Sequence, residues 1–125
     1  MRLMFAGAIL LAFASSAMAD MSVSFDWGPT TKCFDKKSPP ISLSGVPTGT
    51  AKLDIQMTDR NKMDFRHGGG KMAYDGNNSL PYGAFRYTGP CPPPPQTHKY
   101  RFTVKALDAK GNTLATAKAE KPFRQ

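Results

Sequence analysis

Residues 98–106 read HKYRFTVKA, in which aromatic and apolar side chains alternate with charged or hydroxyl-bearing ones. A two-residue period of this kind is typical of a β-strand with one buried and one solvent-facing side. The buried side would carry Tyr100, Phe102 and Val104, and it would start with the polar ring of His98. This segment therefore predicts a strand whose entrance bears two groups capable of hydrogen bonding.

A second alternating segment spans residues 51–58, AKLDIQMT, where Leu53, Ile55 and Met57 share one side. Asp59 continues this apolar side at the end of the predicted strand. Burying a carboxylate without a partner is costly. We therefore expect Asp59 either to find hydrogen-bond donors or to face a cleft.

Three shorter alternating segments predict further strands, at residues 22–27, 41–44 and 113–119. Residues 60–81 are rich in Gly and Asn and predict mostly loop, with a short strand near 63–66. After the first 19 residues, no stretch of ten or more shows the clean 3.6-residue period of an amphipathic helix. These patterns predict an all-β, mainly antiparallel fold.

A proline-rich run at residues 89–95 predicts an ordered, semi-rigid loop, because proline fixes its own backbone and cannot donate to a sheet. One of the two cysteines, Cys91, lies inside this run, and the other is Cys33. In an oxidising compartment such a pair is more often a disulfide than a metal or catalytic site. The sequence favours a Cys33–Cys91 disulfide, with two free thiols, one of them reactive, as the alternative.

The first residues have the pattern of an export signal. Arg2 precedes an apolar run over residues 3–13, and small residues follow, ending in Ala17-Met18-Ala19. We therefore expect residues 1–19 to be a signal peptide and residues 20–125 to be a single domain, periplasmic or secreted, without a transmembrane anchor. A retained anchor is disfavoured because the apolar run is shorter than the roughly 20 residues that cross a bilayer.

The chain is basic, with 17 Lys and Arg residues against 9 Asp and Glu. Removal of Arg2 with the signal peptide leaves 16 basic side chains and a net charge of +7, which attracts anionic partners. The basic residues are spread from Lys32 to Arg124 rather than forming a stripe interleaved with stacking aromatic rings. This distribution argues against a nucleic-acid partner.

Four polar side chains stand where predicted strands run out into loops: Asp59, His67, His98 and Tyr100. If these ends converge, they would form the rim of a pocket. Two histidines and a carboxylate can also bind zinc, but their spacings of 8 and 31 residues match no recognised metal motif. We expect no metal, no cofactor and no catalytic residue, since no serine lies in a G-x-S-x-G elbow and Cys91 sits between prolines.

Two longer motifs are shared with a known family. Residues 38–50 read SPPISLSGVPTGT, and residues 89–94, GPCPPP, lead through His98 and Tyr100 into the strand predicted at residues 98–106. Together these motifs closely resemble the phosphatidylethanolamine-binding protein family, also called the Raf kinase inhibitor protein family, in its bacterial branch. The resemblance covers roughly residues 33–108.

This resemblance implies a β-sandwich with a small pocket at one end that accepts phosphate, acetate or a phospholipid head group. By position, the residues that correspond to the family's pocket and its proline-rich wall are Asp59, His67, Pro90, Pro92, His98 and Tyr100. The sequence also departs from the family, because Arg60 follows Asp59 where a D-P-D motif is usual and Gly68 replaces an aromatic residue. We expect a shortened, divergent sandwich with a shallower or altered pocket.

Simpler roles for these residues stay open. His98 could be a core-edge histidine bonded to backbone, His67 an exposed loop residue, and Asp59 a turn or strand-end cap. The leading hypothesis is an exported, non-catalytic protein that binds a small anion or phospholipid head group, more weakly as pH rises through the histidine range near about 6.5. The alternative is an inhibitor or interaction partner of another protein, such as a kinase or peptidase; a small hydrolase comes third.

Overall fold

The computed structural model describes residues 7–9 and 20–125, so the predicted signal peptide, apart from residues 7–9, lies outside the described residues. This part of the chain contains seven strands and no helix. No candidate membrane-spanning helix is found among these residues. The strands are β1 (Ser22–Phe25), β2 (Ile41–Ser44), β3 (Lys52–Asp59), β4 (Gly69–Ala73), β5 (Ser79–Leu80), β6 (Thr97–Leu107) and β7 (Thr113–Arg124).

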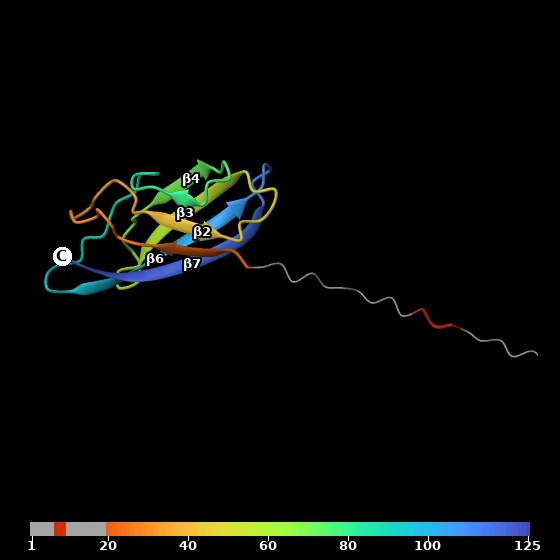
Figure 1. Ribbon diagram of the computed structural model, residues 1–125. Coiled ribbons are helices and arrows are strands. Elements are labelled where there is room, and N and C mark those ends of the chain that lie inside the picture. Colours follow the sequence, from red (N-terminus) through yellow and green to blue (C-terminus); the bar gives the residue numbers. More distant parts are fainter. Residues whose placement is uncertain (1–6, 10–19) are drawn as a thin grey trace, which may run out of the picture.

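The strands form two antiparallel sheets, one in the order β1-β2-β5 and the other in the order β4-β3-β6-β7 (Figure 1). The all-β, antiparallel prediction is confirmed. β3 and β6 pair along the whole of β3, from Lys52 opposite Leu107 to Asp59 opposite Tyr100. This register brings the end of β3 beside the beginning of β6, which are the two strand ends that carry polar groups.

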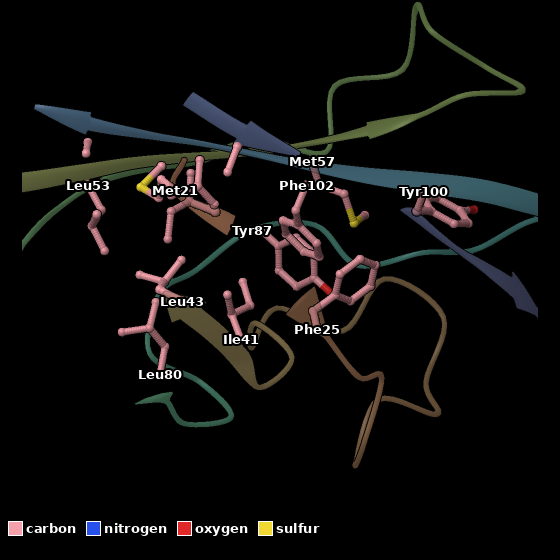
Figure 2. Close-up of a cluster of buried hydrophobic side chains, with 14 of the residues drawn as sticks. Met21, Phe25, Ile41, Leu43, Leu53, Met57, Leu80, Tyr87, Tyr100 and Phe102 are labelled. Carbon is pink, nitrogen blue, oxygen red and sulfur yellow. The ribbon is translucent and has the colours of Figure 1, made fainter. Parts of the chain in front are cut away.

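The core lies between the two sheets. Figure 2 shows Phe25, Ile41 and Leu43 of the smaller sheet extending toward Leu53 and Phe102 of the larger one. Leu53 and Phe102 are fully buried, and Ile41 is 1% exposed. Each large apolar side chain buried in this way contributes about 1.5–3 kcal/mol. The alternating pattern read from the sequence therefore corresponds to the face that each strand turns toward the opposite sheet.

The loop prediction for residues 60–81 is partly wrong. Residues 63–66 form turns rather than a strand, while the glycine-rich segment that follows is β4, paired with β3 from Gly69 to Ala73. A side chain at Gly69 has no room, because a Cβ there would lie 1.9 Å from the carbonyl oxygen of Ile55. Glycine is thus used here for close approach of two backbones, which a reading of glycine as loop overlooks.

The last strand is longer than predicted. β7 continues past residue 119 to Arg124 because β6 offers partners along its full length, down to Thr97 opposite Arg124. Pro122 is accommodated within β7, and its carbonyl accepts a hydrogen bond from Nε1 of Trp27 at 2.7 Å. The β6–β7 pair therefore extends as far as the first residues of β6, Thr97 and His98.

The predicted disulfide between Cys33 and Cys91 is present, and neither cysteine is free. It joins the loop between β1 and β2 to the proline-rich loop between β5 and β6, across 58 positions of sequence. Backbone hydrogen bonds support the same junction, with the Gly89 amide 2.8 Å from the Asp35 carbonyl oxygen. The two loops are consequently held together beside the entrance of β6.

Candidate functional site

Asp59 and His98 form a buried hydrogen-bonded pair at the junction of β3 and β6. Nδ1 of His98 lies 2.7 Å from Oδ2 of Asp59, and the two residues are 7% and 4% exposed. The other carboxylate oxygen accepts the backbone amides of Asn61 and Lys62 at 2.8 and 3.1 Å. Burial raises the pKa of Asp59, but the bonds from His98 and the Asn61 amide outweigh it and hold this pKa below its usual value.

This pairing orients the imidazole of His98. Because the Asp59 carboxylate accepts from Nδ1, the proton at that nitrogen is fixed and Nε2 is turned the other way. Nε2 lies 2.9 Å from the amide oxygen Oε1 of Gln96, an exposed residue directly after the proline-rich run. An incoming ligand could displace this exposed side chain and take its place on Nε2.

His67 is held by the backbone of Thr88, directly before the proline-rich run. Its Nδ1 donates to the carbonyl oxygen of Thr88 at 2.7 Å, and the residue is 3% exposed. Its ring meets that of Tyr100 edge to face, with 5.5 Å between centroids. Burial lowers the pKa of His67, and the bond to Thr88 only partly opposes this effect. Because Nδ1 donates to Thr88, the neutral form of this ring carries no hydrogen on Nε2.

Tyr100 is fully buried, yet its hydroxyl has no hydrogen-bond partner. The nearest polar groups are the Asp59 carboxylate and the backbone of Cys91, which are close enough to shift the pKa of this hydroxyl although no hydrogen bond to either is formed. Burial raises the pKa of Tyr100, and the negative charge of Asp59 raises it further. The phenol is thus a neutral donor whose hydrogen is not used within the protein, which is uncommon for a buried polar group.

These four side chains line one cavity of about 230 Å³, together with Phe34, Lys62, Phe65, Cys91 and Pro93. We call it the His98 cavity. Its floor is polar and its rim is apolar, formed by the stacked rings of Phe34 and Phe65, 5.6 Å apart and 11° from parallel. Lys62 adds a cation that is exposed and paired with Asp64 at 3.3 Å.

The structure brings together the polar residues that the sequence suggested. Asp59, His67, His98 and Tyr100 all line the His98 cavity, so neither a backbone-bonded His98 nor an exposed His67 describes this arrangement. Pro90 and Pro92 do not line this cavity: both are fully buried, and their neighbours Cys91 and Pro93 line it instead. Alternate residues of an irregular loop face opposite sides, and the sequence had no strand period to assign them.

The sequence reasoning did not identify the apolar rim. Phe34 follows the bridged Cys33 directly, and Phe65 lies two residues before His67. The one sequence signal for these two rings is therefore that each is close in the chain to a predicted disulfide or site residue. Within residues 7–9 and 20–125, no group of three or more His, Cys, Asp or Glu side chains is placed to hold a metal ion.

Comparison with known proteins gives a consistent result. The sequence model of the family described as "Phosphatidylethanolamine-binding protein" matches residues 62–124. No curated protein matches the chain by sequence. Among solved structures, a phosphatidylethanolamine-binding protein homologue, CT736 of Chlamydia trachomatis, is 19% identical with a TM-score of 0.64, covering 85% of this chain and 98% of its own.

Escherichia coli YbcL, described as a new member of the mammalian PEBP family, is also 19% identical, with a TM-score of 0.61. That match covers 86% of this chain and 99% of YbcL. At this level of identity the two structures are evidence for the fold. Both are covered almost completely, so the arrangement of strands described above extends over nearly the whole of each relative.

Proposed function

This chain belongs to the phosphatidylethanolamine-binding protein family, and on that premise we propose that it is an exported, non-catalytic binding protein whose His98 cavity takes a small anion. The anion is inorganic phosphate or the phosphate-bearing head group of a phospholipid. A cavity of about 230 Å³ is below the usual size of a site for a drug-sized ligand, which suits a group of a few atoms.

The observation that carries the proposal is the unpartnered hydroxyl of Tyr100. A buried polar group without a hydrogen bond costs roughly 1–3 kcal/mol, so an acceptor from outside the protein would recover that loss. Tyr100 lines the cavity, its pKa is raised and its proton is therefore retained at neutral pH. An anion oxygen is the natural acceptor for such a donor.

Two further donors lie along the same cavity. When its ring carries a proton on both nitrogens, His98 can donate Nε2–H to an anion once Gln96 moves aside, while Nδ1–H stays bonded to Asp59. Lys62 supplies an exposed cation at the edge. The apolar rim of Phe34 and Phe65 then shields these bonds from water, which strengthens them. Asp59 acts as a positioning residue for His98 and does not itself contact the anion.

The test compares Tyr100→Phe with Tyr87→Phe. Both residues are buried and both hydroxyls lack a partner, but only Tyr100 lines the His98 cavity. Calorimetric titration with inorganic phosphate should show an affinity loss of about five- to tenfold for Tyr100→Phe, equivalent to one hydrogen bond, and none for Tyr87→Phe. Both variants should fold at least as stably as the parent, since each removes an unsatisfied group.

Equal phosphate affinities for Tyr100→Phe and the parent protein would overturn the proposal. A His98→Ala variant gives a second reading, with a larger expected loss because His98 supplies a charge-assisted donor when protonated. Glycerophosphoethanolamine, titrated alongside inorganic phosphate, separates the two sources of the anion. Tighter binding of the head group would favour a phospholipid, whereas equal binding would favour free phosphate.

Export is tested separately. If residues 1–19 are removed as a signal peptide, the protein recovered from the periplasm or medium begins at Asp20. Intact mass measurement decides this directly. A protein that keeps residue 1 in the cytoplasmic fraction would contradict export while leaving the binding proposal intact.

A further inference from the structure

A second hollow lies beside the His98 cavity, and it has a different chemistry. It is a groove of about 470 Å³ between the loop that follows β1 and the segment around Tyr82 and Arg86. We call it the basic groove. Four cations line it: Lys32, Lys36, Lys37 and Arg86. Phe34 lines both hollows, so the basic groove and the His98 cavity are neighbours across one aromatic ring.

The charge in the basic groove is not neutralised by the protein. Asp35 is the only acidic residue lining it, and its two oxygens already accept the Lys37 amide at 3.0 Å and the Tyr82 hydroxyl at 2.5 Å. Burial raises the pKa of Asp35, but these two bonds and the nearby lysine charges lower it overall. Asp35 therefore holds the groove wall in place, and its single negative charge cannot neutralise the four positive charges.

The four cations also lack ion pairs, counting partners anywhere in the described part of the chain. Elsewhere the protein pairs its arginines readily, since Arg60 and Arg101 share Glu120. Lys36 instead bonds the Thr88 hydroxyl at 3.1 Å, and Lys37 lies over the Tyr82 ring. Like charges gathered without partners raise the free energy of the folded state. A bound anion would lower it, so the four cations make the basic groove a candidate anion site.

The walls of the groove are fixed in place. The two segments meet at a β-bridge between Lys37 and Arg86, and the Tyr87 amide donates to the Lys36 carbonyl at 3.1 Å. The Cys33–Cys91 disulfide anchors the same loop a few residues earlier. Gly89 allows this close packing, because a Cβ there would lie 2.7 Å from the Asp35 carbonyl oxygen. The cations therefore project from a braced backbone.

We propose that the basic groove is a second anion-binding site, which takes a small polyanion carrying several phosphate or carboxylate groups. A single phosphate would leave most of the four cations without an ion pair. A molecule with several acidic groups can pair with cations from both walls of the groove. Lysine presents a compact, mobile charge that adapts to phosphate or carboxylate oxygens. The proposal is independent of the ligand in the His98 cavity.

The experiment is calorimetric titration of the full mature protein with tripolyphosphate and with citrate at low salt. The test variant combines Lys32→Glu with Arg86→Glu, two exposed cations whose side chains make no hydrogen bond or ion pair within the described part of the chain. The control combines Lys110→Glu with Lys118→Glu, which are exposed, lie outside the groove and change the net charge equally. Thermal melting verifies that both variants are folded.

We expect the groove variant to lose on the order of tenfold or more in affinity for tripolyphosphate, and the control to stay within about twofold. Parental affinity should also fall steeply with added salt. Unchanged affinity in the groove variant, or an equal loss in the control, would overturn the proposal. If the double reversal unfolds, Lys32→Ala and Arg86→Ala singly should each weaken binding severalfold, and no loss in either would be equally decisive.

The result can be separated from that for the His98 cavity. His98→Ala is expected to leave tripolyphosphate binding in the groove unchanged, while the groove variant should still bind inorganic phosphate. Tripolyphosphate binding that depends on His98 and not on Lys32 and Arg86 would assign the polyanion to the cavity and refute a second site.

Discussion

Nδ1 of His98 lies 2.7 Å from Oδ2 of Asp59, although 39 positions separate the two residues in the chain. The register of the sheet explains this contact. Asp59 is directly opposite Tyr100 in the β3–β6 pair, and His98 is two residues earlier on the same side of β6. Such diagonal neighbours are within reach of long side chains. The bond is therefore a consequence of strand pairing that begins at Lys52 and Leu107.

Replacement of Asp59 by Asn should destabilise the protein. Asn can still accept the amides of Asn61 and Lys62, but it removes the charge that holds Nδ1 of His98. A lost charge-assisted bond in a buried place is worth about 1–3 kcal/mol, and urea unfolding at pH 7 measures it. The control is Asp54→Asn on the same strand, whose carboxylate bonds only the exposed Gln56 and should change stability by less than about 0.5 kcal/mol.

The stability of the protein should decrease as pH falls below 7. Folding lowers the pKa of His67 from its ordinary 6.5, so below that pH the unfolded chain binds more protons than the folded one. This contribution is fully present above pH 6.5 and is lost as the solution becomes more acidic. The contribution of Asp59, whose pKa is lowered from 3.8, is lost only at still lower pH.

Urea unfolding at a series of pH values between about 7.5 and 5 measures this slope. His67→Gln keeps a donor that can reach the Thr88 carbonyl but does not titrate, so its slope over this range should be shallower. Parallel curves for the parent protein and His67→Gln would show that His67 is not the group responsible.

Gly69→Ala should be strongly destabilising while Gly70→Ala should not. A Cβ at Gly69 would lie 1.9 Å from the Ile55 carbonyl oxygen and the residue has a φ of 135°, whereas nothing lies within 4 Å of a Cβ at Gly70. We expect a loss of about 2 kcal/mol or more for the first and a change within about 0.5 kcal/mol for the second. Thermal melting of the two variants side by side would contradict this if their midpoints coincided.

Removal of the disulfide should lower stability and weaken binding together. The Cys33–Cys91 bridge closes a long loop, for which chain entropy gives about 4 kcal/mol as an upper figure. It also holds Phe34 and Cys91 at the edge of the His98 cavity. A Cys33→Ser, Cys91→Ser double variant should unfold at lower urea and bind phosphate less tightly. Free thiols in the unreduced native protein, detected by mass spectrometry after labelling, would contradict the bridge.

Much of the site could be read from the sequence because it lies at the ends of strands. Alternation places Asp59 on the buried side of β3, and the same parity places His98 and Tyr100 on the buried side of β6. For such residues a period of two is enough to assign the face. That the two strand ends meet follows from the antiparallel pairing of β3 with β6, which is a feature of the tertiary structure.

Residues in irregular segments could not be assigned in this way. The sequence predicts a strand near 63–66, where the chain turns, and a loop at the glycines of β4, because composition is the only signal there. The lining of the proline-rich loop was placed at Pro90 and Pro92 rather than at Cys91 and Pro93. Each of these outcomes depends on contacts with segments far away in the chain.

The sequence by itself determined the antiparallel β fold and the polar groups at the ends of the strands. It also determined the disulfide partners, since the chain has two cysteines. These properties depend on the local period of side chains and on residue chemistry. Only the tertiary structure decided that four of those groups share one cavity, that Phe34 and Phe65 form its rim and that four cations gather next to it. Distances between loops are set by how two sheets pack and which loops are tied together, and no local pattern of residues encodes them.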